Sequence, residues 1–183
     1  MAQLSLNKDY ITVYDDVIEP RLCDNLITFF EKNIKHTHRE ETDHRAFQEL
    51  NLSLVPKYEQ AIGKLLRPYF DLYKKDNNIS DYVWPQTFQM EHTRFKRYMP
   101  NTDDRFDIHA DATTKMTSSR FLVLFVYLSN NDSGHTSFPD RDIKVQPKQG
   151  RLLMFPPMWP WYHAGKKPMS QNKYILHSYC HYG

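Results

Sequence analysis

A His-x-Asp motif in the second half of the sequence offers two metal-binding side chains at close spacing. The motif consists of His109 and Asp111 and lies in the segment 106–111. Side chains two residues apart on a β-strand point to the same face, so both could reach one metal ion. By itself the motif is weak evidence, because a chain with nine histidines contains such pairs by chance.

A second histidine completes a set of ligands that is typical of one kind of metal centre. His163 follows the strand-like segment 151–155. Two histidines and one carboxylate form the facial triad of non-haem iron(II) oxygenases, which leaves coordination positions open for substrates. Imidazole and carboxylate suit Fe(II), although neither ligand type excludes zinc or manganese. The sequence therefore predicts a metal site made by His109, Asp111 and His163.

A lysine stands ten residues after the second histidine, at the start of the segment KYILHSYCHY. With Lys173 in this place, the chain resembles the prolyl 4-hydroxylase-like branch of the Fe(II)/2-oxoglutarate-dependent oxygenase superfamily. Three further segments are similar to that family in the same order: VYDDVIEPRLCDNLITFF, FVYLSNNDSGHTSFP and GRLLMFPPMWPWYHAG. The resemblance implies that Lys173 binds the distal carboxylate of 2-oxoglutarate through a charge-assisted hydrogen bond.

The same resemblance assigns further residues to the cosubstrate and the substrate. Tyr98 and Tyr127 match residues that line the 2-oxoglutarate pocket. Arg120, seven residues before Tyr127, stands where the prolyl hydroxylases place an arginine that contacts the peptide substrate. Phe106 and Tyr179 depart from the family, which has tyrosine and tryptophan at these positions beside the target residue. The implied cofactors are Fe(II), 2-oxoglutarate as cosubstrate and O2, with stimulation by ascorbate as a secondary expectation.

The elements that must position these residues fall into two parts. Apolar residues recur at helical spacing between residues 16 and 76, in two stretches separated by the polar connection HTHREETDHRAFQELN. From residue 84 to residue 182 the pattern changes to short strands separated by turn residues. The clearest predicted strands are 88–98, 120–129, 151–155 and 173–182. We therefore expect one domain, residues 1–183, that is mainly β: a double-stranded β-helix (jelly roll) packed against N-terminal helices.

Composition excludes several other classes of protein. The formal net charge of +2 is too small to argue for a nucleic acid or an anionic membrane as partner. No apolar run approaches the roughly 20 residues of a membrane helix, and no secretory signal is visible at the N-terminus. Only two cysteines are present, far apart in sequence, so a disulfide scaffold is not expected. These features predict a cytoplasmic protein.

The leading functional hypothesis is hydroxylation of a residue in a peptide or protein, with proline as the best single candidate. One alternative is hydroxylation of a free amino acid or another small molecule on the same core. A second alternative is a catalytically inactive jelly roll that binds a metal or ligand without turnover. A complete set of three ligands and Lys173 favours the enzyme, because a binding protein has no need of all four.

Overall fold

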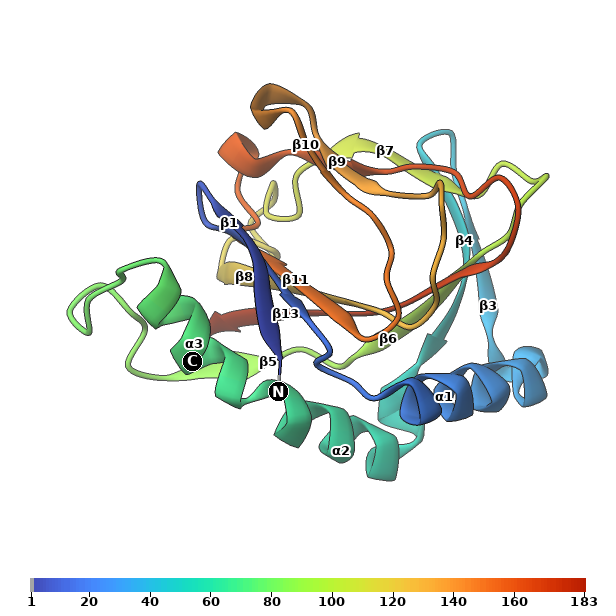
Figure 1. The fold of residues 1–183 in the computed structure, drawn as a ribbon, viewed down its shortest axis with the longest axis horizontal. Helices are drawn as coiled ribbons and strands as arrows, with labels where there is room; N and C mark the ends of the chain where they lie inside the picture. Colours follow the sequence, from blue (N-terminus) through green and yellow to red (C-terminus); the bar gives the residue numbers. More distant parts are fainter. Residues whose placement is uncertain (1) are drawn as a thin grey trace.

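The computed structural model describes residues 2–183 and shows a curled antiparallel sheet with helices along one side (Figure 1). This arrangement confirms the predicted jelly roll packed against helices. The helices are α1 (Pro20–Lys32), α2 (Pro56–Leu66) and α3 (Pro68–Asp76), and short 3-10 helices lie at Ile34–His36, Leu52–Leu54, Pro139–Arg141 and Trp159–Trp161. The strands are β1 (Gln3–Lys8), β2 (Ile11–Asp15), β3 (His38–Glu41), β4 (Arg45–Asn51), β5 (Phe88–Met90), β6 (Arg94–Tyr98), β7 (Arg105–His109), β8 (Arg120–Tyr127), β9 (Thr136–Phe138), β10 (Ile143–Val145), β11 (Arg151–Phe155), β12 (His163–Gly165) and β13 (Lys173–Tyr182).

The sheet brings strands from distant parts of the chain together. Its hydrogen-bonded order is β1-β2-β11-β8-β13-β6-β4-β7-β12-β9-β10, with β3 added beside β4 and β5 beside β13. Because the sheet curls, β7, β9 and β10 lie on the side opposite the helices (Figure 1). The segment with the His-x-Asp motif and the segment with His163 meet where β7 pairs with β12.

The central strands are buried on both faces, which explains their nearly continuous apolar sequence. In β8, Leu124 and Val126 belong to the core between the sheet and the helices. Phe125 and Tyr127 belong to a second core inside the curled sheet. Alternation along the strand therefore sends every second residue toward the helices and the others toward the interior. The predicted strands 151–155 and 173–182 coincide with β11 and β13, whereas 88–98 divides into β5 and β6.

Prolines set where the helices begin. α1 has Pro20 in its first turn, as predicted, and buries Leu26 and Phe30 against the sheet. The second helical stretch is not one helix, because Pro68 has no backbone N–H to continue α2 and instead begins α3. Among residues 2–183, no helix is both long enough and apolar enough to cross a membrane.

The prediction of a polar connection between the helical stretches was wrong. Residues 38–51 form the hairpin of β3 and β4, and β4 pairs with both β6 and β7 inside the sheet. Phe47 enters the inner core and Leu50 enters the core beneath the helices. Between them Glu49 faces a cavity. A charged residue that faces a cavity interrupts the apolar alternation by which a strand is recognised in sequence.

Candidate active site

The three predicted metal ligands meet at the end of β7. His109 is the last residue of β7, and it lies opposite His163, the first residue of β12. Asp111 lies two residues beyond the strand, where its backbone N–H donates to the carbonyl of Pro157 at 2.9 Å. Asp111 is therefore positioned by a loop contact and not, as the sequence suggested, by the strand itself. The ligand atoms of all three residues lie within 4.8 Å of one another.

The chemistry of these atoms fits a divalent metal ion. Asp111 Oδ1 lies 3.5 Å from His109 Nε2, and Asp111 Oδ2 lies 3.5 Å from His163 Nε2. Asp111 Oδ2 and His163 Nε2 are buried without a hydrogen-bond partner among residues 2–183. Unpaired buried polar atoms of this kind are costly unless something binds them. The three side chains could therefore hold an ion between them.

Both histidines are held in the form that binds metal through Nε2. His109 Nδ1 lies 2.7 Å from the carbonyl oxygen of Asp107, and His163 Nδ1 lies 3.2 Å from that of Trp161. In each case the carbonyl accepts from an N–H on Nδ1, so the lone pair is left on Nε2. Burial lowers the pKa of His163 to about 4, so its ring is neutral near pH 7.

The carboxylate ligand is kept ionised by its surroundings. Burial raises the pKa of Asp111, but the neighbouring His163 and His109 lower it by more, so that the net shift is downward. The hydroxyl of Tyr179 donates to Asp111 Oδ1 at 2.6 Å. Phe106 packs against the first ligand, with its ring stacked on that of His109 at a centroid distance of 3.5 Å. Tyr179 and Phe106 thus support the ligands directly.

Lys173 lies in a small pocket behind the metal ligands, which we call the inner pocket. Its ammonium donates to the carbonyls of Gly134, at 3.0 Å, and Lys166, at 3.2 Å. Gly134 has φ +50°, and a Cβ there would lie 3.3 Å from the Lys173 side chain. Glycine is thus favoured at the turn that binds the lysine. Burial, followed by the nearby Lys96, lowers the pKa of Lys173 to about 7.

Both predicted tyrosines line the inner pocket. The ammonium of Lys173 lies 4.2 Å from the centre of the Tyr98 ring, across the pairing of β6 with β13. The hydroxyl of Tyr127 lies 2.6 Å from Thr136 Oγ1. The charge and hydrogen-bonding groups suit a dicarboxylate that reaches from the metal toward Lys173. The cavity measures about 20 Å³, room for roughly one water, so side chains must move when a larger molecule enters.

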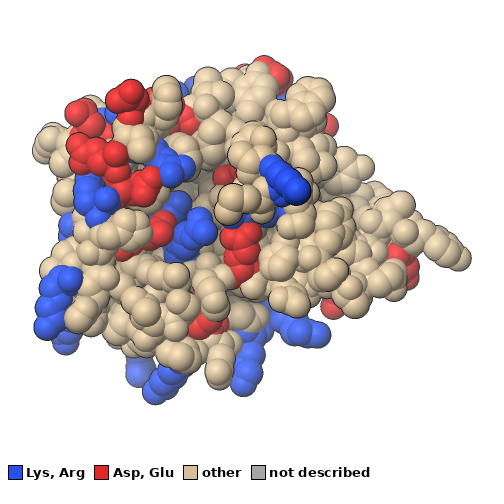
Figure 2. Space-filling model, turned by 180° about the vertical axis from the view of Figure 1, so that it is seen from behind, with Lys and Arg blue, Asp and Glu red and all other residues tan. Residues whose placement is uncertain are grey.

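A wider hollow of about 380 Å³, which we call the outer cavity, opens on the other side of the ligands. Its walls come from β3, β4, β6, β7, β13, the start of β8 and the segment that links β7 to β8. Charged side chains dominate them: Glu40, Arg45, Glu49, Arg94, Lys96 and Arg120. On the face drawn in Figure 2, acidic and basic residues likewise alternate and do not form one basic patch.

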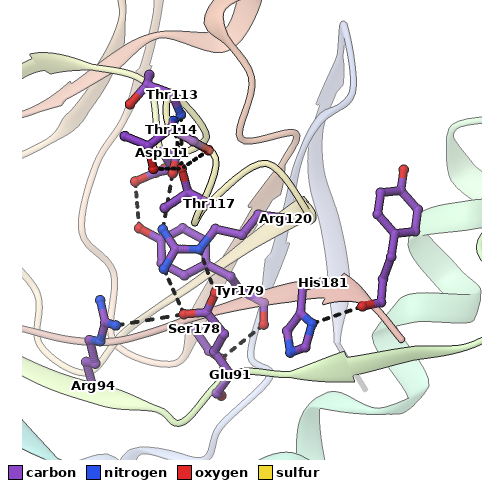
Figure 3. A network of polar contacts seen from close by, with 11 residues as sticks. Glu91, Arg94, Asp111, Thr113, Thr114, Thr117, Arg120, Ser178, Tyr179 and His181 are labelled. Atoms are coloured by element: carbon purple, nitrogen blue, oxygen red, sulfur yellow. Dashed lines mark hydrogen bonds and ion pairs between the residues drawn. The ribbon is translucent and has the colours of Figure 1, made fainter.

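Arg120 reaches the outer cavity but is largely engaged by the protein (Figure 3). Its guanidinium donates to both carboxylate oxygens of Glu91, at 2.5 and 2.8 Å, and to the backbone carbonyl of Asp111 at 3.1 Å. It also lies 3.7 Å above the Tyr179 ring. Two of its five N–H groups remain for a substrate. Arg120 therefore orients the Asp111 loop as well as forming a cavity wall.

Lys96 and His177 are among the residues at this site that the sequence reasoning missed. Lys96 lines both compartments, and His177 lines the inner pocket. His177 is 2% exposed, and neither ring nitrogen has a hydrogen-bond partner within the described part of the chain. The available signal was the alternation of strand residues: Lys96 is two residues before Tyr98, and His177 is two residues before Tyr179.

Comparison with known proteins supports this reading of the site. Residues 93–181, which contain all three ligands, match the model of the 2OG-Fe(II) oxygenase superfamily. No curated protein matches the chain in sequence.

Solved structures share the fold. The viral collagen prolyl hydroxylase of Paramecium Bursaria Chlorella virus-1, in its 2OG complex, superposes with a TM-score of 0.72 at 20% identity, covering 95% of this chain and 97% of that one. A Pseudomonas putida prolyl-4-hydroxylase gives 0.68 at 14% identity, with 96% and 94% covered. A Trichoplax adhaerens prolyl hydroxylase, solved with a peptide fragment of hypoxia inducible factor, gives 0.70 at 14% identity, with 96% and 85% covered.

The matched segment, the ligand cluster and the pocket for a dicarboxylate agree, and they favour an enzyme over a jelly roll that binds without turnover. Residues 93–181 match the 2OG-Fe(II) oxygenase superfamily, and together with the shared fold and the ligand cluster this match supports an iron- and 2-oxoglutarate-dependent dioxygenase that uses O2.

Proposed function

We propose that the chain hydroxylates an amino-acid residue that enters the outer cavity, with a prolyl residue of a peptide as the leading substrate. The carrying observation is the arrangement of His109, Asp111 and His163 between a pocket for a dicarboxylate and a cavity open to solvent. When bound, iron and 2-oxoglutarate supply the oxidation: one oxygen atom of O2 enters succinate, the other enters the substrate C–H bond, and carbon dioxide leaves.

The protein's part in this reaction is to bind and position. His109, Asp111 and His163 would hold the metal, and an iron(II) ion held by three protein ligands would have positions to offer to the cosubstrate and O2. Lys173 binds the distal carboxylate of 2-oxoglutarate, and Tyr98 and Tyr127 form the walls around it. Tyr179, Phe106 and Arg120 lie on the substrate side, where they shape the entrance to the metal.

The fold shared with prolyl hydroxylases favours a peptidyl proline, and one of those structures contains a peptide fragment. The charged walls of the outer cavity favour a second candidate, a free amino acid, because a prolyl chain segment itself carries no charge. Specificity is a difference in transition-state binding, so the altered positions Phe106 and Tyr179 bear directly on it.

The test compares 2-oxoglutarate turnover by the iron-loaded protein with a proline-rich peptide, the same peptide with every proline replaced, and free proline. A peptidyl prolyl hydroxylase is stimulated by the first alone, and mass spectrometry shows that this peptide gains one oxygen atom. Stimulation by free proline alone would establish the small-molecule hydroxylase. Equal turnover with all three would show that none of them is the substrate.

A further inference from the structure

The inward face of β6 runs from the outer cavity to the inner pocket. Arg94 lines the outer cavity, Lys96 lines both compartments, and Tyr98 lines the inner pocket. The intervening residues point the other way: Phe95 enters the core beneath the helices, and Arg97 donates to Glu31 on α1 at 3.0 Å. Strand alternation therefore places two cations in a row beside the metal ligands.

The side chain of Lys96 is buried, and its ammonium makes no hydrogen bond within residues 2–183. The residue is 4% exposed, and none of the hydrogen bonds among residues 2–183 is made by its Nζ. Its nearest carboxylate is Glu49 at 3.7 Å, and the ring of Phe47 lies 4.3 Å away. A buried ammonium is costly unless it is paired and hydrogen-bonded. Its three donors therefore suit an acceptor that enters from the cavity.

Arg94 also has donors to spare. Its nearest carboxylate is Glu91, at 3.8 Å, which is beyond hydrogen-bond distance. Figure 3 shows Glu91 between the two arginines, with both of its carboxylate oxygens accepting from Arg120. Arg94 thus stands at the cavity wall in an ion pair with Glu91, but without a hydrogen bond to it.

A structural ion pair between Lys96 and Glu49 explains these observations less well. At 3.7 Å the two groups make no hydrogen bond, and Glu49 is also approached by His38 at 3.9 Å. A purely structural pair in the sheet requires neither group to face a cavity, whereas both residues line the outer one. Of the other basic residues that line the cavity, Arg45 donates to Glu40 and Arg120 donates to Glu91. Arg94 and Lys96 are left without a hydrogen-bonded acid among residues 2–183.

We propose that Arg94 and Lys96 form a binding site for a carboxylate of the substrate, beside the metal ligands. This inference rests on the proposed hydroxylase function and narrows its substrate class. The carboxylate belongs to a free amino acid, or to an acidic side chain or C-terminus of a peptide next to the target residue. A carboxylate accepts two hydrogen bonds from a guanidinium and a further one from an ammonium, so both residues can bind it together.

The experiment measures binding under anaerobic conditions to the protein loaded with iron(II) and 2-oxoglutarate. The probes are free L-amino acids, their amides, and short peptides with glutamate or glutamine beside each residue tested. Isothermal calorimetry compares the wild type with Arg94→Gln, Lys96→Met and the control Arg97→Gln, which removes a cation from the opposite face of the same strand. In Lys96→Met the carboxylate of Glu49 loses its cation, and the double variant Lys96→Met/Glu49→Gln removes that unpaired charge as a cause of weaker binding. Thermal melting checks the fold of each protein.

We expect at least one acidic probe to bind the wild type, and its amide to bind far more weakly. Arg94→Gln, Lys96→Met and the double variant should each weaken the acidic probe about 10- to 150-fold, while Arg97→Gln leaves it unchanged. Free amino acids and acidic peptides distinguish the two sources of the carboxylate. Equal binding of acids and amides, or no binding of any acid, would overturn the inference.

Two further results separate this inference from the function on which it rests. If Lys96→Met weakens 2-oxoglutarate and leaves the acidic probes unchanged, Lys96 serves the cosubstrate, and the inference fails. If an uncharged peptide stimulates 2-oxoglutarate turnover, the inference fails while the hydroxylase stands. If the wild type binds neither iron nor 2-oxoglutarate, the proposed function fails first.

Discussion

The inner pocket and the outer cavity lie on either side of the same metal ligands, yet they are built by opposite means. In the inner pocket one buried cation is held by two backbone carbonyls, among aromatic walls that leave about 20 Å³. The outer cavity is open, measures about 380 Å³ and has charged side chains on several strands. The inner cation, Lys173, is held by backbone carbonyls, whereas the outer cation Arg120 is held by the carboxylate of Glu91. The position of the inner cation therefore depends more on the backbone of the fold than the position of the outer one does.

The largest effect should come from the loss of a metal ligand, because the inner pocket and the outer cavity both border the metal site. His163→Ala removes a metal ligand, and we expect the loss of iron affinity to exceed the roughly 10- to 100-fold cost of losing a ligand's hydrogen-bond partner. The jelly roll has cores of its own, so the fold should remain. Iron content after gel filtration and circular dichroism measure these outcomes. His92→Ala, whose ring is 70% exposed, is the control, and equal iron content in both variants would exclude the ligand set.

A substitution in the inner pocket alone should weaken cosubstrate binding without affecting metal binding. Lys173→Met removes a charge-assisted contact, which should weaken 2-oxoglutarate about 10- to 150-fold and leave iron binding in place. The control is Lys167→Met, because that lysine lies at the surface, 3.8 Å from Asp103. The dissociation constant of 2-oxoglutarate is the measurement. An unchanged constant would mean that Lys173 serves packing only.

The inner pocket should also respond to pH. Burial and then Lys96 lower the pKa of Lys173 to about 7, so the free protein carries more neutral amine as the pH rises above that value. A bound dianion favours the ammonium, and binding therefore takes up a proton and weakens by at most about tenfold per pH unit above 7. Calorimetry in two buffers of different ionisation enthalpy measures the uptake. Proton release on binding, or affinity that rises with pH, would contradict this assignment.

The smallest effect should come from a side chain of the outer cavity that supports one metal ligand. Tyr179→Phe removes the hydroxyl that donates to Asp111 Oδ1 at 2.6 Å. We expect iron affinity to fall by about tenfold, the lower end for the loss of a ligand's partner, because the other carboxylate oxygen is untouched. A metal titration with a competing chelator resolves a change of this size. The same variant should leave the affinity for 2-oxoglutarate nearly unchanged, and a large loss there would show that the compartments are coupled.

The sequence predicted the part of the site that follows from spacing. His109, Asp111, His163 and Lys173 stand in order in the sequence, and the structure brings the first three together, with Lys173 behind them. The fold class also followed, because strands buried on both faces read as apolar runs.

The residues that escaped prediction share one physical property: they are polar side chains on the inward face of a strand. Glu49 interrupts the apolar alternation that marks a strand, so β4 reads as a connection. Lys96 and His177 lie in strands that were predicted, but no motif marks them as residues of the site. Local patterns fail where a site requires polarity in the interior. Only the pairing of β4 with β6 and of β6 with β13 shows that these side chains share one space.

The inward face of β6 also acts as a molecular ruler. Alternate residues of a strand are spaced by about 6.6 Å, so the side chains of Arg94, Lys96 and Tyr98 leave the backbone of β6 at fixed intervals. Pairing of β6 with β4 on one side and with β13 on the other fixes the register of the strand, and with it the positions of these side chains. If Arg94 and Lys96 bind the substrate carboxylate, removing either cation would change how long a molecule fits between that carboxylate and the metal site. The contact between Tyr98 and Lys173 would stay the same. The length of the accepted substrate could therefore differ between related enzymes without a change at the 2-oxoglutarate site.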